Sequence, residues 1–224
     1  NVSENTFELG RNFANKIWNA VRYVLMNNEN PDLEKGAKPD NMYDRWILTR
    51  LFDTENAVNS AMETYRFADT AQILYEFFWH DFCDWYLEIC KVNKSDMNTA
   101  VYVISRFIRM LNPIMPYITE EINSIIGGTG LIQASYGKTN EYTFNEDSNN
   151  VNVLRSLITA MRNLIAETGT ARIEIMPEQS HRKLTEDNAG VIKELAKAEQ
   201  VEITDSEPEK SVPGIFDGGM VFVR

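Results

Sequence analysis

The chain has 224 residues, of which 43% are hydrophobic and 25% charged, and its formal net charge is -11. This balance is typical of a globular protein with one or two domains. The acidic charge argues against broad electrostatic attraction to nucleic acid or to an anionic membrane, although it leaves room for a local basic face. No run of about eighteen apolar residues occurs, so the sequence predicts no transmembrane helix and no membrane partner.

The first 126 residues have the apolar periodicity of helices. The first four predicted helices lie within residues 1–28, 41–65, 67–92 and 96–111. Asp96 is a plausible cap for the fourth of these. A fifth helix is predicted to start with Asn112 as its cap and Pro113 at the first helical position, where the missing N–H costs nothing. The glycines of residues 127–130 should end that helix.

The rest of the chain has a different pattern. LIQASY and EYTF could pair as a short hairpin around GKTN, and NEDSNN resembles a linker. Beyond it, a helix is predicted over 151–168, strands over RIEIMP, VEIT and GGMVFVR, and a helix over AGVIKELAKAE. We therefore expect a mainly α protein, in which an antiparallel helical bundle (1–126) and an irregular linker (127–150) precede a small α/β or α+β domain (151–224).

The first helix contains no Asp or Glu between Leu9 and Asn28, although the chain as a whole is acidic. At about 100° per residue, its side chains divide into two arcs. The apolar arc, which should pack into the bundle, holds Phe13, Ala14, Ile17, Trp18, Ala20, Val21, Val24 and Leu25. The polar arc holds Arg11, Asn12, Asn15, Lys16, Asn19, Arg22, Tyr23 and Asn27.

The polar arc is unusual because exposed helix faces generally mix Glu with Lys. Asparagine donates and accepts hydrogen bonds, Lys and Arg neutralise phosphate, and tyrosine offers a flat ring on which an unpaired base can stack. This combination suits a nucleic-acid loop. The alternative is that the Asn and Arg side chains pair with carboxylates on neighbouring helices, and composition and spacing alone leave both interpretations open.

An acidic stripe lies on the third predicted helix, where Asp81, Asp84 and Glu88 are three and four residues apart. We interpret it as structural, with Arg22, Arg45, Arg50 or Arg106 as partners, because no histidine base, serine elbow or glycine-rich loop accompanies it. Cys83 and Cys90 lie about 10 Å apart along the same helix, too far for a disulfide. With no CxxC and no ligand-spaced histidine, the sequence predicts neither a metal site nor a catalytic site.

Several segments resemble the anticodon-binding bundle of valyl-tRNA synthetases, which are class I enzymes. They are FANKIWNAVRYVLMN, DRWILTRL, YRFADTAQILYEFFWHDFCDWYLEICK and LNPIMPYITEEI, in this order and spacing. The resemblance covers residues 7 to about 126. It extends over 151–224 through LITAMRNLIAET and GGMVFVR, although GTARIEIMP stands where the family commonly has a more basic stretch.

The resemblance implies a ligase that activates valine with ATP, transfers it to its tRNA and edits mischarged threonine. The HIGH-type and KMSKS-type ATP signatures are absent from this sequence, as are the editing domain and the C-terminal arm. The chain should therefore be a piece without catalytic site, metal or cofactor of its own. ATP would be used by the catalytic core of the same synthetase chain, which is the expected partner in cis, in a cytoplasmic and monomeric enzyme.

The family's anticodon contacts come largely from the first bundle helix. Carried over by resemblance, they fall on Lys16, Arg22 and Tyr23, with Asn15 and Asn19 as neighbours on the same arc. The family more often has Phe where Tyr23 stands, and stacking should survive that difference. The expected partner is the anticodon stem-loop of valine tRNA. The alternatives are the equivalent domain of an isoleucyl-tRNA synthetase and a helical protein-interaction module.

Overall fold

A computed structural model describes residues 4–28, 37, 39–128, 130–131, 142–209 and 211–223, with side chains in the first helix from Glu8 onward. The chain divides into two compact units. One contains Asn1–Cys90 and Lys94–Phe144, and the other contains Lys91–Asn93 and Asn145–Arg224. Each is described by itself. The division into domains predicted from the sequence stays a prediction, because compact packing alone does not show that a unit folds independently.

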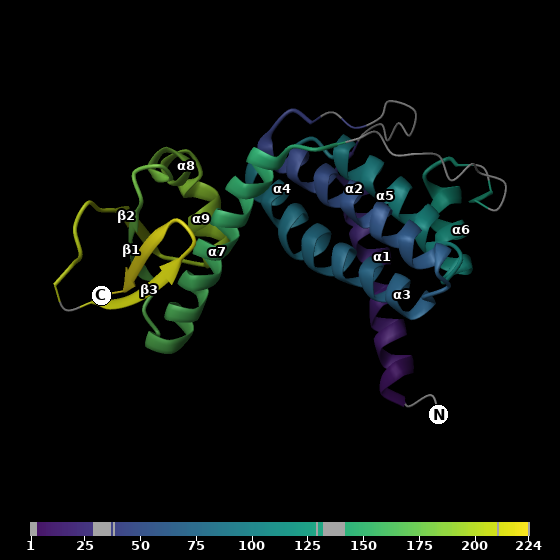
Figure 1. Cartoon of the computed structure of the whole chain (residues 1–224), viewed down its shortest axis with the longest axis horizontal. Helices are drawn as coiled ribbons and strands as arrows, with labels where there is room; N and C mark the ends of the chain where they lie inside the picture. Colours follow the sequence, from purple (N-terminus) through teal and green to yellow (C-terminus); the bar gives the residue numbers. More distant parts are fainter. Residues whose placement is uncertain are drawn as a thin grey trace. The chain divides into compact units, whose positions relative to one another are not determined.

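The first part of the chain is helical, as predicted (Figure 1). Its elements are α1 (Glu4–Met26), α2 (Met42–Glu63), α3 (Phe67–Glu76), η1 (Phe77–Tyr86), α4 (Leu87–Asn93), α5 (Asn98–Leu111) and α6 (Pro116–Ile125). Helix α1 packs against η1, α5 and α6, while α2 packs against α3, η1 and α5. Aromatic rings fill the centre of this bundle, where the Phe78 and Phe107 centroids are 4.2 Å apart. The first turns of α1 extend beyond the neighbouring helices in Figure 1.

The third predicted helix is continuous but not uniform. Its middle, η1, is a ten-residue π-helix, in which the Leu87 N–H donates to the Phe82 carbonyl five residues earlier. Seven of its residues are buried, and five of these are aromatic. π-Helices are rare and usually a single turn long. Here the wide backbone follows the packing of large rings against α1 and α2, which no local pattern in the sequence indicates.

The helix starts agree with the predicted caps only in part, because the Asn41 cap of α2 was not predicted and α5 begins at Asn98 with Met97, and not Asp96, at the cap position. The Asn41 side chain accepts hydrogen bonds from the Tyr43 and Asp44 N–H groups at the start of α2, and the Asp96 carboxylate accepts from the Asn98 N–H at 2.9 Å. The expected start of α6 at Asn112 and Pro113 is wrong. That helix begins at Pro116, and the Asn112 amide instead donates to the Thr119 hydroxyl at 2.9 Å.

The second unit combines helices with a four-stranded sheet, which agrees with the predicted α/β or α+β class. Its elements are α7 (Asn145–Thr168), β1 (Arg172–Pro177), α8 (Arg182–Asp187), α9 (Ala189–Ala196), β2 (Gln200–Ile203), β3 (Val212–Phe216) and β4 (Gly219–Val223). Residues 145–150, expected in the linker, form the first turns of α7. Helix α8 and strand β3 were not predicted. The expected hairpin around GKTN lies largely outside the described residues.

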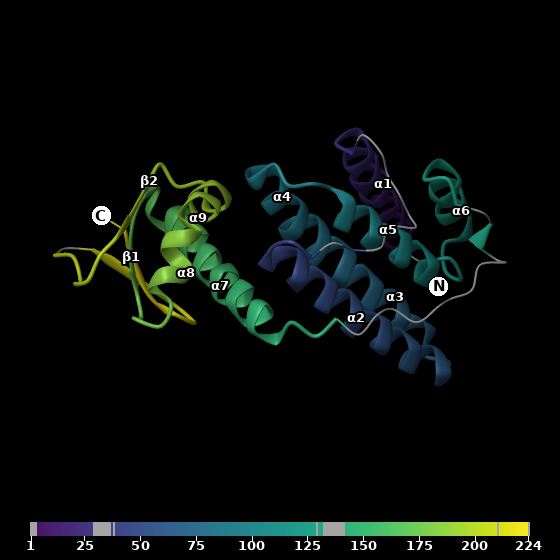
Figure 2. The same cartoon turned by 90° about the horizontal axis from the view of Figure 1, so that it is seen from above.

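The sheet has the strand order β2-β1-β4-β3. Strands β1 and β2 are parallel and joined through α8 and α9, while β4 runs antiparallel to both β1 and β3. Asp217 and Gly218 form the two-residue turn between β3 and β4, a sequence that favours tight hairpins. Figure 2 shows α7 and α9 on the same side of the sheet, and Ile173 and Ile175 of β1 are buried.

Candidate nucleic-acid interface

Helix α1 buries one face and leaves the other to solvent. Phe13, Ile17, Ala20, Val21 and Val24 are buried, as the apolar arc predicted. The exposed face contains Asn12, Asn15, Asn19 and Arg22. Lys16 and Arg22 are six residues apart and differ by about 120° around the helix axis, so they lie at the two edges of this face. The Lys16 edge adjoins η1, and the Arg22 edge adjoins α6.

The Lys16 edge is occupied by protein partners. The Lys16 Nζ atom donates to Asp84 Oδ1 at 2.9 Å, and the two side chains keep 33% and 39% of their surface exposed. The same ammonium lies 5.0 Å from the centroid of the Trp79 ring. In addition, His80 Nδ1 lies 3.3 Å from Asp84 Oδ2. Lys16 is thus already paired with a carboxylate and an aromatic ring.

The pKa of Lys16 reflects this pairing. Partial burial lowers the pKa, but the hydrogen bond and the negative charge of Asp84 outweigh it, with a smaller contribution from Glu88. The net result is a pKa above the ordinary value of 10.5. Lys16 therefore stays charged at neutral pH, yet its charge is locally compensated.

The other predicted residues of the polar arc divide by position. Asn15 and Asn19 are exposed, and within the described part of the chain their amides make no hydrogen bond. Tyr23 is half-buried on the Lys16 side of the arc, and its backbone carbonyl accepts from the Asn27 side chain at 2.8 Å. The structure thus keeps the five predicted residues on one helix, but it divides their surroundings into a paired edge and an open one.

The Arg22 edge is the open one. Arg22 is exposed, and none of the described residues forms an ion pair or hydrogen bond with its guanidinium. Beside it lies a groove of about 230 Å³ between α1 and α6. Its lining residues are Trp18, Val21, Arg22, Leu25, Met26 and Ile125. Among the described residues, Arg22 is the only charged one in this lining, so they give the groove an apolar floor with one cation.

The prediction that the apolar arc packs into the bundle is wrong for Trp18, because its side chain is not fully buried. It is 39% exposed, and Met26 and Ile125 on the same groove are 75% and 49% exposed. Helix α6 has only ten residues and ends at Ile125, so no described element covers the ring completely. The signal available in the sequence was the position of Trp18 at the edge of the apolar arc, four residues before Arg22.

The acidic stripe is structural, as interpreted from the sequence. Asp81 accepts from Arg50 Nε of α2 at 2.8 Å, and Arg50 was among the expected partners. Asp84, by contrast, pairs with Lys16 of α1, which was not among them. The buried pair of Arg106 with Glu55, at 2.6 Å, involves no member of the stripe. Asp81 and Asp84 thus form ion pairs with residues of other helices, and Asp84 is bonded to Lys16, one of the predicted RNA-binding residues.

The described residues contain no group of three or more His, Cys, Asp or Glu side chains that could hold a metal ion. Cys83 and Cys90 are buried and form no disulfide within the described part of the chain. Burial raises the pKa of Cys90 to about 12, which makes it a poor nucleophile at neutral pH. No helix among the described residues is long and apolar enough to span a membrane.

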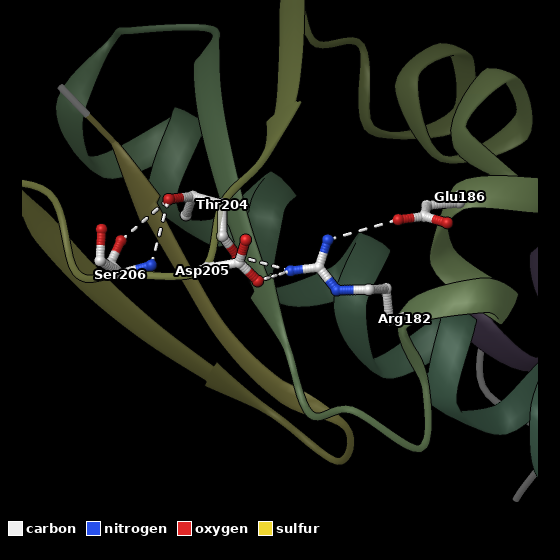
Figure 3. Close-up of polar contacts among 5 residues, drawn as sticks. All are labelled: Arg182, Glu186, Thr204, Asp205 and Ser206. Atoms are coloured by element: carbon white, nitrogen blue, oxygen red, sulfur yellow. Dashed lines mark hydrogen bonds and ion pairs between the residues drawn. The ribbon is translucent and has the colours of Figure 1, made fainter.

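In the second unit, Arg182 is committed to protein partners (Figure 3). Its guanidinium pairs with Asp205 and with Glu186, the latter at 3.3 Å, and donates to the Thr204 carbonyl. The Thr204 hydroxyl donates in turn to the Ser206 carbonyl at 3.0 Å. These contacts attach α8 to the chain that follows β2. They leave this cation little capacity for a phosphate.

Comparison with known proteins gives a family match and many similar sequences. The family described as the anticodon-binding domain of tRNA ligase matches residues 44–176, which include α2 to β1. A valine–tRNA ligase of Aquifex aeolicus is 33% identical over 263 residues, covering 100% of this chain and 22% of that protein. One from Listeria innocua is 33% identical over 95% of this chain and 26% of its own length.

A third relative, a valine–tRNA ligase of Legionella pneumophila strain Lens, is 36% identical over 76% of this chain and 21% of its own length. The chain thus spans about a quarter of the length of the curated relatives it matches. The family match begins after α1. The similarity to the Aquifex protein includes α1, because it covers the whole chain.

Proposed function

We propose a function for this chain from the fact that it belongs to the family of anticodon-binding domains of tRNA ligases. The chain is the anticodon-binding region of a valine–tRNA ligase, and it binds the anticodon stem-loop of valine tRNA. The similarity to valine enzymes at 33–36% identity supports this assignment over the isoleucine alternative. Valine activation with ATP, transfer to tRNA and editing of threonine belong to other parts of the same polypeptide, in a cytoplasmic and monomeric enzyme.

The observation that carries the proposal is the free polar face of α1. Asn15, Asn19 and Arg22 are exposed, and they lie in a stretch without acid from Leu9 to Asn28 in a chain of net charge -11. Exposed amides can hydrogen-bond the edges of unpaired bases, and an arginine can hold the adjacent phosphate. This face can therefore bind a single-stranded RNA loop although most of the surrounding protein repels RNA.

Lys16 and Tyr23 have a conditional role in this proposal. Lys16 reaches a phosphate only by exchanging its bond to Asp84, which stays close and keeps part of the repulsion. Exposed ion pairs of this kind contribute little to stability, so the exchange costs little in folding energy. Tyr23 offers the accessible part of its ring. We therefore place the first contacts of the RNA on Asn15, Asn19 and Arg22, with Lys16 and Tyr23 joining as the loop settles.

A binding experiment with the 224-residue chain tests the function. Fluorescence anisotropy at low salt should show binding of a valine-tRNA anticodon stem-loop, and weaker binding of the same stem-loop with a substituted anticodon. An Asn15→Ala, Asn19→Ala double variant should reduce this discrimination. A matched control is Gln72→Ala, which removes an exposed amide on α3 that is bonded to Glu76. Equal affinity for both RNAs would rule out anticodon recognition by this chain.

A further inference from the structure

We infer that the groove between α1 and α6 is a second base-binding site, in which Trp18 stacks an unpaired base of the bound RNA and Arg22 holds its phosphate. This inference rests on the proposed function and deepens it, because it names a contact on the opposite edge of α1 from Lys16 and Tyr23.

The groove exposes apolar side chains that a folded protein ordinarily buries. Trp18, Met26 and Ile125 are 39%, 75% and 49% exposed, and they meet Val21 and Leu25 in one depression. Scattered apolar residues on a surface need no explanation, but a contiguous apolar depression commonly marks a binding site. An indole ring is the largest flat surface a protein can offer to a base, and stacking on it tolerates any base.

The charge of the groove selects an anionic occupant. Arg22 is the single charged residue in the lining and has no partner among the described residues. Trp18 and Arg22 are four residues apart on α1, so their side chains are neighbours on the helix surface. Glu121 lies one turn before Ile125 on α6, but it is not part of the lining. A flat apolar ring next to an unpaired cation fits a nucleotide, whose base is flat and whose phosphate is negative.

The position of the groove makes simultaneous contact with both edges possible. Asn15 and Asn19 lie between the two edges of α1, about 20° and 60° from Arg22 around the helix axis. An RNA loop that lies across these amides therefore passes from the Lys16 and Tyr23 edge to the groove. One unpaired base would then meet Tyr23 and another would meet Trp18, while the amides contact the nucleotides between them.

The test measures anisotropy of the 224-residue chain with the anticodon stem-loop. Trp18→Ala should weaken binding about fivefold or more, the expected loss of one stacked base, and Trp18→Phe should retain most of the affinity. Ile125→Glu, on the other wall of the groove, should weaken binding more than Tyr117→Glu. That control adds the same charge to the same helix at a side chain that is 93% exposed and outside the groove.

Abasic substitutions in the RNA loop identify the stacked base. At one position, removing the base should weaken binding to the wild-type chain but not to Trp18→Ala. If anticodon discrimination persists while Trp18→Ala and Ile125→Glu bind like wild type, the inference is overturned and the proposed function stands. If no stem-loop binds specifically, the proposed function itself fails. A sedimentation experiment in which the wild type dimerises and Trp18→Ala does not would also overturn the inference, by assigning the groove to a second copy.

Discussion

The two edges of α1 differ in what surrounds Lys16 and Arg22. At one edge, Lys16 is bonded to Asp84 and lies over the Trp79 ring. At the other edge, Arg22 is exposed beside an apolar groove and has no partner among the described residues. On a helical wheel, Lys16 and Arg22 both appear simply as cations on the polar face. We expect a cation on this polar face to attract RNA more strongly when its own protein compensates it less.

This difference has an energetic consequence for binding. A phosphate that approaches Arg22 gains a charge-assisted contact and displaces only water. A phosphate that approaches Lys16 must replace Asp84, and the carboxylate it displaces remains nearby and repels it. The two edges should therefore contribute unequally to affinity and to its dependence on salt. Variants at each edge test whether the two contributions differ.

A substitution at a buried position of α1 and one at a groove position should differ most in their effect on the free energy of unfolding. Ile17 is fully buried, so Ile17→Ala should lower the free energy of unfolding by about 2–5 kcal/mol. Trp18 is the next residue but is 39% exposed, so Trp18→Ala should cost clearly less than Ile17→Ala. Urea unfolding followed by circular dichroism measures both. A loss for Trp18→Ala as large as that for Ile17→Ala would mean that the indole belongs to the core and not to a binding groove.

The next effect concerns RNA affinity. Arg22→Glu should weaken binding of the anticodon stem-loop about tenfold or more and reduce the slope of log K against log salt by about 1, because one phosphate contact is lost. Arg11→Glu makes the same charge change on the same helix and serves as the control. Arg11 lies three residues from Glu8, and the two charges are 3.6 Å apart.

A salt series of anisotropy titrations separates these variants. The comparison of the two edges predicts that Arg22→Glu has the larger effect on both the affinity and the salt slope. Equal losses for the two arginines would show that α1 attracts RNA through its overall charge, and that the position of Arg22 beside the groove is unimportant.

The sequence predicts those features that depend on neighbouring residues. The acid-free face of α1 and the alternating strand β1 both follow from local spacing, and the structure contains them. Strand β3 was missed because VPGIF contains a proline and a glycine, which weaken a strand pattern. A Cβ atom at Gly214 would lie 2.9 Å from Leu164 Cδ1, so a larger residue there would require the leucine side chain to shift.

The features that the sequence cannot predict depend on distant partners. The π-helix η1 forms where large rings pack between helices. The Lys16–Asp84 bond joins residues 68 positions apart. The exposure of Trp18 depends on where α6 ends, which is more than a hundred residues away in the chain. The predicted site residues could thus be placed on one helix, but which of them are free to bind RNA depends on tertiary structure.

The smallest effect concerns the Lys16–Asp84 bond itself. Because the pKa of Lys16 is raised in the folded state, the bond stabilises the protein fully below the ordinary lysine pKa of 10.5. This contribution is lost as the pH rises through the higher, folded-state pKa. Since both side chains are about one-third exposed, solvent screening limits it to below about 1 kcal/mol.

Urea unfolding of the wild type and of Lys16→Met at pH 8 and at pH 11.5 measures this contribution. The difference in unfolding free energy between them should shrink at the higher pH, and Asp84→Asn should reproduce the pH-dependent part of the Lys16→Met loss at pH 8. Ionisation of tyrosines affects all three proteins alike, so it cancels in the differences. A difference that stays constant with pH would mean that Lys16 contributes through the packing of its alkyl chain alone and not through its charge. Its charge would then be as available to RNA as that of Arg22, and the two edges of α1 would be equivalent.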